Sequence, residues 1–352
     1  MYSKTVRPIA IITGPDTYVD HLGVICYLLD IPLLITEEET YATALAFYPQ
    51  LRLIHKPMQE LSLEFLAEEF TVIFESGKFW MTELDPFVRL IYQKALRFVY
   101  CPHGNSDKGH SIGKHVEQDI VLFYGEHMLS LLKKTGAAQK IRNLVRIGNI
   151  RLLFYNKYKQ FYIKLVENQV LSHLALEKKT ILYAPTWQDG ENPTSFFQEI
   201  RRVVSELQEE FNLIIKLHPF LEAFHPAQVA YFMSFCEERR GLLFLRKFPT
   251  IYPLLEVCDL YLGDYSSIGY DFLFFDRPLY FFAGEGGASA ATLLHSCGLC
   301  IPAGERLDTF IRSTLERNQE EKRRKRQEVY AWAFGEEKPF SLIREELLLT
   351  IQ

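Results

Sequence analysis

The sequence predicts an α/β protein built from two successive domains, each with a parallel β-sheet covered by helices on both faces. Three observations support this. The strand candidates are continuous apolar runs, which is typical of strands buried on both faces, and they alternate with helical patterns. The alternation stops in a helical stretch at Ile150–Lys178 and then begins again. A chain of 352 residues also suits two domains better than one, because single cores rarely grow beyond about 250–300 residues.

The first half opens with the apolar run Pro8–Thr13, followed by Gly14-Pro15-Asp16 and a helical pattern from about Tyr18 to Leu29. Further apolar runs predict strands at Leu33–Ile35, Leu51–Ile54, Thr71–Phe74, Arg97–Tyr100, Asp119–Phe123 and Leu144–Ile147. Helical patterns between these runs lie at Leu61–Glu69, Pro86–Leu96 and Glu126–Lys134. The order of elements predicts a Rossmann-like domain over residues 1–160.

The second half repeats the alternation. Strands are predicted at Thr180–Ala184, Leu213–Leu217, Leu242–Leu245, Asp259–Leu262 and Leu279–Phe282. Helices are predicted at Ser195–Phe211, Ala227–Glu238 and Ile251–Val257. We therefore expect a second Rossmann-like domain over residues 161–325, with residues 326–352 forming helices that pack back on the first domain. In such sheets ligands bind beyond the carboxyl ends of the strands, here in a cleft between the domains.

Composition argues against nucleic-acid binding, secretion and a membrane-spanning segment. The net charge of −5 gives no basic field for a nucleic-acid partner, so none is expected. Six cysteines, most of them in apolar runs, are typical of the reduced thiols of a cytoplasmic protein. We expect no secretory signal, because the Met1 end carries no long apolar segment. The richest apolar stretch, Tyr270–Ala283, contains three charged residues and a proline and cannot span a bilayer.

Polar residues gather just after the predicted strands, where parallel sheets bind ligands. His103-Gly104 follows the strand at Arg97–Tyr100, and Lys216-Leu-His218-Pro219 closes another. Thr186 and Asp189 follow Thr180–Ala184. Scattered structural polar residues would lie at both ends of the sheets, so this one-sided gathering predicts a binding site.

The stretch Asp259–Phe282 reads as strand, turn, helix and strand, with Asp264, Ser266 and Ser267 in the turn. Unpaired N–H groups and the helix dipole make such a turn a seat for a phosphate. Structural alternatives stay open for each residue. Asp264, Ser266 or Thr186 could be an ordinary helix cap, and His103 or His218 could only satisfy a nearby carbonyl.

A metal or cofactor is not expected. Cys101, His103, His110 and His115 have irregular spacing in a Gly-rich loop, which is a poor zinc pattern. No Asp-x-Asp pair stands at a strand end to hold a divalent cation. Cys297-Gly-Leu-Cys300 has the spacing of a redox pair without the surrounding pattern, so packing is the better interpretation.

Three blocks now carry a resemblance: Tyr183-Ala-Pro-Thr-Trp-Gln-Asp189, Lys216-Leu-His218-Pro219, and Asp264-Tyr-Ser-Ser267 with Asp271 and Arg277-Pro278. In order and spacing they resemble the CDP-glycerol glycerophosphotransferase family, the wall teichoic acid primases and polymerases. The resemblance covers residues about 100 to 283. It implies the GT-B architecture, in which two Rossmann-like domains face an interdomain cleft.

The resemblance also implies roles. His103 resembles the general base of the family and His218 its phosphate contact, so both are expected to be catalytic. Ser266 and Ser267 match the hydroxyls that hold the pyrophosphate of the donor, and Thr186 would line the donor site. The remaining substrate-binding residues expected are Gly104, Asp189, Lys216, Asp264 and Asp271.

The implied function is transfer of a phosphopolyol group, similar to glycerol phosphate, from a CDP-activated donor to a hydroxyl acceptor in cell-envelope polymer synthesis. The implied partners are a CDP-linked polyol, or another nucleotide-diphosphate donor, and a lipid-linked acceptor. This places the protein in the cytoplasm, peripheral to the inner face of the membrane. Lys322–Arg326 and Phe154–Tyr162 are the segments that could contact lipid.

Departures from the family pattern keep two alternatives open. The family has Trp-His-Gly-Thr-Pro where this chain has Pro102-His103-Gly104-Asn105-Ser106, and its Pro-Arg-Asn-Asp is reduced to Gly148-Asn149-Ile150-Arg151. The surroundings of His103 favour a catalytically idle GT-B scaffold. The divergent loop Gly284–Ala291 favours a GT-B glycosyltransferase or epimerase that uses a UDP-sugar. The polyol or sugar, the acceptor and the oligomeric state stay open.

Overall fold

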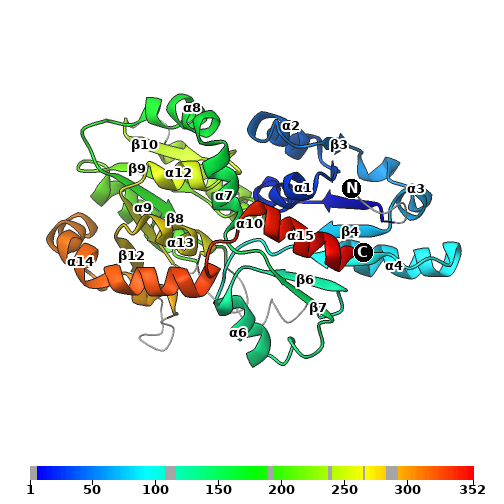
Figure 1. Cartoon of the computed structure of the whole chain (residues 1–352). Helices are drawn as coiled ribbons and strands as arrows, with labels where there is room; N and C mark the ends of the chain where they lie inside the picture. Colours follow the sequence, from blue (N-terminus) through cyan, green and yellow to red (C-terminus); the bar gives the residue numbers. More distant parts are fainter. Residues whose placement is uncertain (1–5, 108–115, 189–193, 237–239, 265, 283–291) are drawn as a thin grey trace. The chain divides into compact units, whose positions relative to one another are not determined.

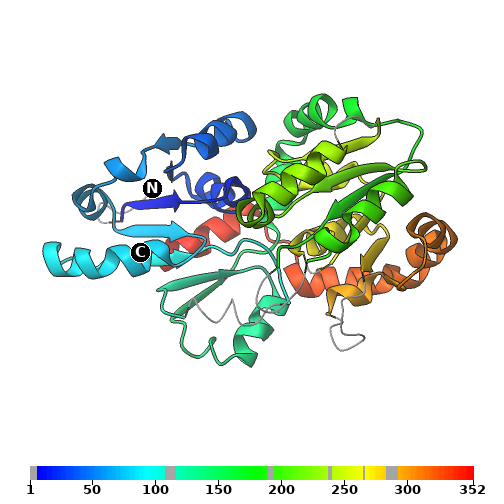
Figure 2. The same cartoon turned by 180° about the vertical axis from the view of Figure 1, so that it is seen from behind.

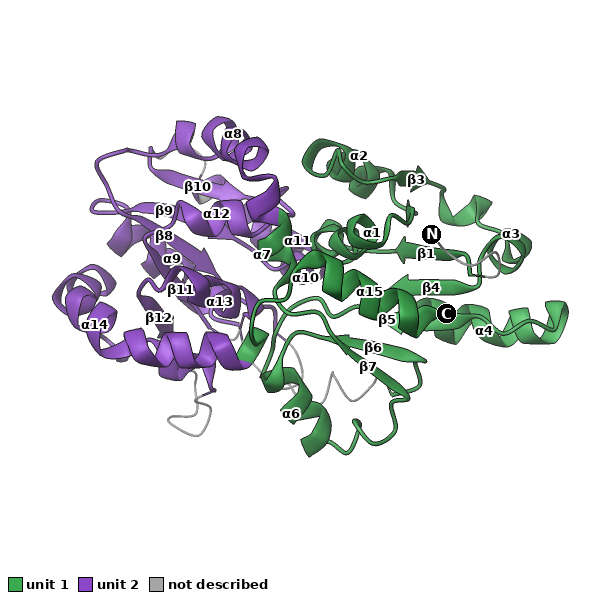
Figure 3. Cartoon of the chain, viewed as in Figure 1, with its two compact units in different colours: residues 1–154, 333–352 green, residues 155–332 purple. Residues whose placement is uncertain are grey.

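The computed structural model of the protein describes residues 6–107, 116–188, 194–236, 240–264, 266–282 and 292–352. The chain divides into two compact units (Figure 3). Unit 1 contains Met1–Phe154 and Ala333–Gln352, and unit 2 contains Tyr155–Trp332. The described residues form one parallel sheet in each unit, with seven strands in unit 1 and six in unit 2. The two Rossmann-like sheets expected from the sequence are confirmed.

The sheet of unit 1 has the strand order β3-β2-β1-β4-β5-β6-β7. Its strands are β1 Pro8–Ile12, β2 Leu33–Ile35, β3 Leu53–His55, β4 Val72–Glu75, β5 Arg97–Tyr100, β6 Ile120–Phe123 and β7 Asn143–Arg146. The chain winds outward from β1 to β3 and then returns to β4, so the winding direction reverses between β1 and β4. The carboxyl ends on either side of this reversal are where such sheets bind ligands.

The helices of unit 1 cover both faces of its sheet (Figures 1 and 2). They include α1 Val24–Leu29, α2 Glu38–Phe47, α3 Leu63–Glu69, α4 Phe79–Tyr92, α6 Glu126–Lys134 and α15 Phe340–Ile351. Trp80, Leu84 and Val88 of α4 pack with Ile73 of β4 and Phe98 of β5 in a buried cluster. Apolar side chains spaced by a helical turn therefore hold α4 on the sheet.

Helix α2 was not predicted, and two predicted helices of unit 1 differ in form or start from the prediction. The stretch expected as one helix from Tyr18 begins with a 3-10 turn at Asp16–Tyr18 and a π-helix at Val19–Gly23 before α1. Helix α4 begins at Phe79, seven residues before the predicted start at Pro86, so the proline lies inside the helix. The earlier start has a physical reason. The Glu75 carboxylate accepts hydrogen bonds from the N–H groups of the first turn.

The sheet of unit 2 has the order β10-β9-β8-β11-β12-β13, which repeats the winding of unit 1. Its strands are β8 Thr180–Ala184, β9 Asn212–Lys216, β10 Leu242–Leu245, β11 Leu260–Gly263, β12 Leu279–Phe282 and β13 Leu299–Ile301. Strand β13 was not predicted, because it has only three residues after Gly298 and so small an apolar run gives no clear strand pattern. The reversal of winding lies between β8 and β11.

The helices of unit 2 include α8 Lys159–Gln169, α9 Phe196–Leu207, α10 Pro219–Phe224, α11 Pro226–Cys236, α12 Tyr252–Glu256 and α13 Ser267–Phe272. Helix α9 buries Phe196, Ile200, Val203, Val204 and Leu207 against the sheet, as its periodicity predicts. Two helices run across the boundary between the units, α7 Ile150–Lys157 and α14 Leu307–Phe334.

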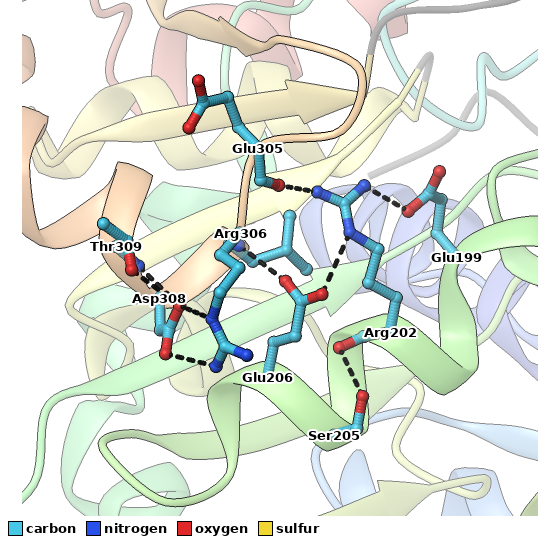
Figure 4. A network of polar contacts seen from close by, with 9 residues as sticks. Glu199, Arg202, Ser205, Glu206, Glu305, Arg306, Asp308 and Thr309 are labelled. Carbon is cyan, nitrogen blue, oxygen red and sulfur yellow. Dashed lines mark hydrogen bonds and ion pairs between the residues drawn. The ribbon is translucent and has the colours of Figure 1, made fainter.

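Polar contacts join α9 to the start of α14 within unit 2 (Figure 4). Arg202 of α9 pairs with Glu199 and Glu206 and also donates to the carbonyl oxygen of Glu305. Glu206 in turn accepts a hydrogen bond of 2.7 Å from the N–H of Leu307, the first residue of α14. A carboxylate at this position satisfies an otherwise unpaired N–H and complements the helix dipole.

The end of the chain returns to unit 1, as the predicted fold requires. Helix α15 lies beside α1 and β7. Arg97 of β5 donates to the carbonyl oxygens of Thr350 and Ile351, at 2.7 and 2.9 Å, and so holds the last turn of α15. Among the described helices, none combines the length and apolar character needed to cross a bilayer.

Candidate functional site

In unit 2 the predicted residues gather at the reversal between β8 and β11. The buried Asp264 follows β11 and accepts hydrogen bonds from the N–H of Thr186, after β8, at 2.7 Å and from the N–H and hydroxyl of Ser195, both at 2.9 Å. The Thr186 carbonyl accepts a further bond from the Thr194 hydroxyl at 2.6 Å. Asp264 therefore ties the ends of two neighbouring strands to the start of α9 and fixes the shape of the turn.

Ser266 and Ser267 stand at the N-terminus of α13. Ser266 is the N-cap, and its Oγ accepts a hydrogen bond from the N–H of Ile268 at 3.3 Å. Ser266 is buried and Ser267 is half-buried. The cap anticipated for Ser266 is therefore present, and the Ser267 hydroxyl lies at the first helical position, where unpaired N–H groups and the dipole favour an anion.

His218 is the N-cap of α10. Its Nδ1 accepts a hydrogen bond of 3.2 Å from the N–H of Phe220, and Pro219 occupies the first helical position. A nitrogen that accepts from a backbone N–H carries no proton, so in the neutral ring the proton lies on Nε2. The ring is half-buried, with its centroid 6.0 Å from that of Trp187. This tautomer makes Nε2 a donor.

Lys216 and Asp271, also predicted to bind substrate, are buried and bonded to protein groups. Lys216 Nζ donates to the carbonyl oxygen of Phe248 at 2.7 Å, and Asp271 Oδ1 accepts from the Tyr252 hydroxyl at 3.0 Å. These contacts connect β9 and α13 to the neighbouring loop and helix α12. Both side chains support the turns that carry His218 and Ser267.

In unit 1 His103 follows β5. Its Nδ1 lies 3.2 Å from the carbonyl oxygen of Ser76, and the ring centroid lies 5.2 Å from that of Tyr18. Because a carbonyl can only accept, Nδ1 carries the proton and Nε2 of the neutral ring keeps its lone pair. His103 is exposed at the surface, but the protein atoms packed around its ring partly desolvate it and lower the pKa of His103, while the Ser76 carbonyl acts in the opposite direction.

The Tyr124 hydroxyl, just after β6, holds the loop that carries His103. Gly104 has φ +130°, a conformation that favours glycine, and its N–H donates to the Tyr124 hydroxyl at 3.1 Å. The same hydroxyl donates to the Pro102 carbonyl at 2.7 Å, and His21 Nδ1 lies 3.0 Å from it. Burial lowers the pKa of His21 well below its ordinary value, with the charges of Arg151 and His103 adding to the effect. Gly104 therefore shapes the loop.

Sequence reasoning missed a group of buried residues beside His103. Glu75 ends β4 and accepts hydrogen bonds from the N–H groups of Trp80 and Met81, and Gln118 donates to both Glu75 and the Gly77 carbonyl. Burial raises the pKa of Glu75 to about 7, and the two backbone hydrogen bonds oppose the shift. An acidic residue that closes an apolar strand at the reversal of winding was the available signal.

Some predicted features lie outside the described residues: Asp189, Tyr265, His110, His115 and the loop Gly284–Ala291. Within the described part of the chain, no group of three or more His, Cys, Asp and Glu side chains is arranged to hold a metal ion. The described site residues therefore offer two features in separate units. In unit 1, the tautomer of His103 leaves the lone pair of Nε2 available to accept a proton. In unit 2, His218 can donate a hydrogen bond from Nε2, and Ser266 and Ser267 stand at the start of α13.

The family model matches a segment that lies almost entirely in unit 2. Residues 152–288 match the model of a family described as CDP-glycerol:poly(glycerophosphate) glycerophosphotransferase. A teichoic acid glycerol-phosphate primase of Bacillus spizizenii is 32% identical over 111 residues, which are 31% of this chain and 26% of the primase. A teichoic acid poly(ribitol-phosphate) polymerase of the same organism is 27% identical over 157 residues, 42% of this chain and 23% of the polymerase. The chain thus spans only about a quarter of the length of these relatives.

Solved structures match the whole described fold. The wall teichoic acid polymerase TagF superposes with a TM-score of 0.63 at 14% identity, covering 98% of this chain and 88% of TagF. Anabaena Alr3699/HepE in complex with UDP-glucose has a TM-score of 0.56 at 13% identity, covering 98% of this chain and 99% of that one. At such identities the likeness establishes the fold. The architecture is therefore GT-B, and residues 152–288 resemble the CDP-glycerol:poly(glycerophosphate) glycerophosphotransferase family.

Proposed function

We propose that the protein transfers a phosphopolyol group, such as glycerol phosphate, from a CDP-activated donor to a hydroxyl acceptor. The observation that carries this proposal is the match of residues 152–288 to the family model, because that segment contains β8, β9, β11 and the turns that carry His218, Ser266 and Ser267. Two curated relatives are a teichoic acid polymerase and a teichoic acid primase, which supports a polyol phosphate as the transferred group.

Unit 2 would hold the donor. Its diphosphate would lie against the N-terminus of α13, with Ser267 donating a hydrogen bond and Ser266 capping the helix. His218 would donate from Nε2 to a phosphate oxygen, which is the role its tautomer allows. Thr186, Lys216, Asp264 and Asp271 would hold the turns in place, and Asp189 would contact the donor. Fixed donors of this kind stabilise the charge that develops on a departing phosphate.

Unit 1 would supply the base. The acceptor oxygen attacks the phosphorus that bears the polyol, the bond from that phosphorus to the bridging oxygen breaks, and CMP leaves with the electron pair. His103 Nε2 takes the hydroxyl proton, and Gly104 shapes its loop. The lowered pKa of His103 keeps the ring neutral near pH 7, as a base requires. The proposal requires the two units to bring His103 and the donor phosphate together, in an interdomain cleft as in other GT-B proteins.

The acceptor is proposed to be lipid-linked, which would place the protein at the cytoplasmic face of a membrane. The two segments considered for lipid contact are only partly exposed. Arg326 is buried and binds Asp276, which also pairs with Arg323. Phe154, Tyr155 and Tyr162 are buried as well. Lipid contact by the basic segment would therefore rest on Arg323 and Arg324, whose side chains are exposed.

The test is release of CMP. The purified protein is incubated with CDP-glycerol and a short glycerol-phosphate oligomer on a lipid-like carrier in detergent, and CMP and the extended oligomer are measured together. CDP-ribitol and UDP-glucose serve as alternative donors under the same conditions. Acceptor-dependent CMP release from a CDP-polyol supports the proposal. Turnover of UDP-glucose alone would instead identify a glycosyltransferase, and binding of CDP with no turnover of any donor would identify a scaffold.

A further inference from the structure

The turn that follows β4 in unit 1 brings together buried polar groups beside His103 that the proposed reaction does not yet use. Glu75, Ser76 and Gln118 are 2%, 5% and 2% exposed. Ser76 supplies the carbonyl oxygen that faces His103 Nδ1 at 3.2 Å. The orientation of the imidazole therefore depends on how firmly the backbone of Ser76 is held.

Glu75, the last residue of β4, fixes this turn through hydrogen bonds to α4. Its Oε2 accepts from the N–H of Trp80 at 3.0 Å, and its Oε1 accepts from the N–H of Met81 at 3.3 Å. The N-cap residue of α4, Lys78, makes no hydrogen bond of this kind with its side chain. Glu75 thus replaces the missing cap and ties the end of β4 to the first turn of a 14-residue helix, with Ser76 between them.

Gln118 fixes the turn from the other side. Its Nε2 donates to Glu75 Oε1 at 3.2 Å and to the Gly77 carbonyl at 2.6 Å. Both protons of the amide are therefore used on the two residues that flank Ser76. Gln118 thus joins the Glu75 carboxylate to the Gly77 carbonyl, one on each side of Ser76, and so limits the movement of the turn that carries the Ser76 carbonyl.

We propose that Glu75, together with Gln118, is a positioning residue for His103: the pair holds the Ser76 carbonyl so that His103 keeps its proton on Nδ1 and presents an unprotonated Nε2 to the acceptor hydroxyl. This inference rests on the proposed function for its catalytic meaning. Its structural content, a tautomer fixed through a backbone carbonyl, stands without the reaction.

The variant Glu75→Gln tests the proposal because it keeps the size of the side chain and changes one oxygen to an amide NH2. In either orientation that NH2 faces a backbone N–H of α4, so at least one cap bond is lost. Ser62→Ala is the matched control. Ser62 caps α3 in the same unit by accepting from Phe65 N at 3.1 Å.

The first measurement does not depend on activity. Nitrogen-15 NMR of histidine-labelled protein reports the tautomer of His103, whose signal is assigned by its loss in His103→Ala. We expect the Nδ1–H tautomer in the unaltered protein and in Ser62→Ala, and a mixture of tautomers in Glu75→Gln. An unchanged His103 signal in Glu75→Gln would overturn the proposal.

The second measurement uses CMP release. Glu75→Gln should lower kcat by about tenfold to a hundredfold with little change in the KM for the donor, since small misplacements of a catalytic group cost rates of that order. In a His103→Ala background the same change should have little further effect. Equal losses in both backgrounds would overturn the positioning role. If His103→Ala itself kept full turnover, the base assignment of the proposed function would fall, and the NMR result would still decide the inference about the tautomer.

Discussion

Units 1 and 2 each carry a histidine just after the carboxyl end of a strand, and the backbone gives the two rings opposite roles. His103 faces the Ser76 carbonyl through Nδ1, so its Nε2 is an acceptor. His218 faces the N–H of Phe220 through Nδ1, so its Nε2 is a donor. Both distances are 3.2 Å, and the difference lies entirely in which backbone group the ring meets.

The contrast gives the same residue type the tautomer of a base in one place and the tautomer of an anion contact in another, which are the roles proposed for the two residues. His218 precedes Pro219, which starts a helix, so its side chain meets the unpaired N–H groups of that helix. His103 precedes Gly104 with φ +130°, which sends the chain into a loop and leaves the ring beside a carbonyl of the turn that follows β4. The predictions below test this contrast from its largest expected consequence to its smallest.

The largest effect is expected for His103→Ala, the change that removes the acceptor nitrogen. Loss of a general base should lower kcat by on the order of 10²–10⁴, while the Kd for CDP-glycerol changes little. In the unaltered protein, kcat/KM should fall as the pH falls through the lowered pKa of His103, because only the neutral ring accepts a proton. CMP release measured across pH checks both.

The control for this change is His173→Ala, which removes an exposed histidine from unit 2. It should leave kcat and the pH profile as they are. Normal turnover by His103→Ala would mean that His103 is not the general base. The proposed role of His218 as a hydrogen-bond donor would be unaffected.

The next effect concerns Glu75, which holds the Ser76 carbonyl. The folded protein raises the pKa of Glu75 from 4.5 to about 7, so between these values the folded state binds more protons than the unfolded state. The free energy of unfolding should therefore fall as the pH rises through this window. At about 1.4 kcal/mol per pKa unit, the contribution is on the order of 3 kcal/mol.

Denaturant unfolding of the unaltered protein and of Glu75→Gln, each measured from about pH 4.5 to pH 8, isolates this contribution, because other titrating groups cancel in the difference. We expect the difference in free energy of unfolding, unaltered minus variant, to become smaller as the pH rises. A difference that stays constant across the range would mean that Glu75 does not titrate there.

The sequence predicted most of the strands and the turn at the start of α13. It did not predict the backbone groups that decide the tautomer of His103. Apolar runs predicted the strands of both sheets except β13, and the Asp264–Ser267 turn was predicted at the start of a helix. The position of Glu75 was missed because its role depends on α4 beginning at Phe79, before Pro86, and proline usually marks a helix start. Likewise, no local pattern tells that His103 meets a carbonyl 27 residues earlier in the chain.

A smaller effect is expected at His218, where capping and donor binding can be separated. In His218→Asn, the side-chain oxygen can still accept from the Phe220 N–H, but the donor Nε2–H is lost. A hydrogen bond to a charged phosphate contributes about 1.5–3 kcal/mol, so the Kd for CDP should rise roughly tenfold to a hundredfold in both His218→Asn and His218→Ala. Calorimetric titration with CDP measures it.

Stability then distinguishes the two variants, because only His218→Ala also loses the cap of α10. It should be less stable than His218→Asn by about 1 kcal/mol. If His218→Asn bound CDP as tightly as the unaltered protein, His218 would only cap α10. The proposed hydrogen bond from its Nε2 to the donor phosphate would then be wrong.

The smallest effects are expected at Ser266 and Ser267, the adjacent hydroxyls of unit 2. Only Ser266 caps α13, with Oγ 3.3 Å from the Ile268 nitrogen, so Ser266→Ala should lower the free energy of unfolding by about 1 kcal/mol. Ser267→Ala should leave it within about 0.5 kcal/mol and raise the Kd for CDP by about threefold to tenfold, since one hydrogen bond contributes about 0.5–1.5 kcal/mol. Unfolding curves and CDP titrations of both variants separate the roles. Equal losses of stability would mean that Ser267 also supports the helix, and unchanged CDP binding in Ser267→Ala would move the diphosphate away from this turn.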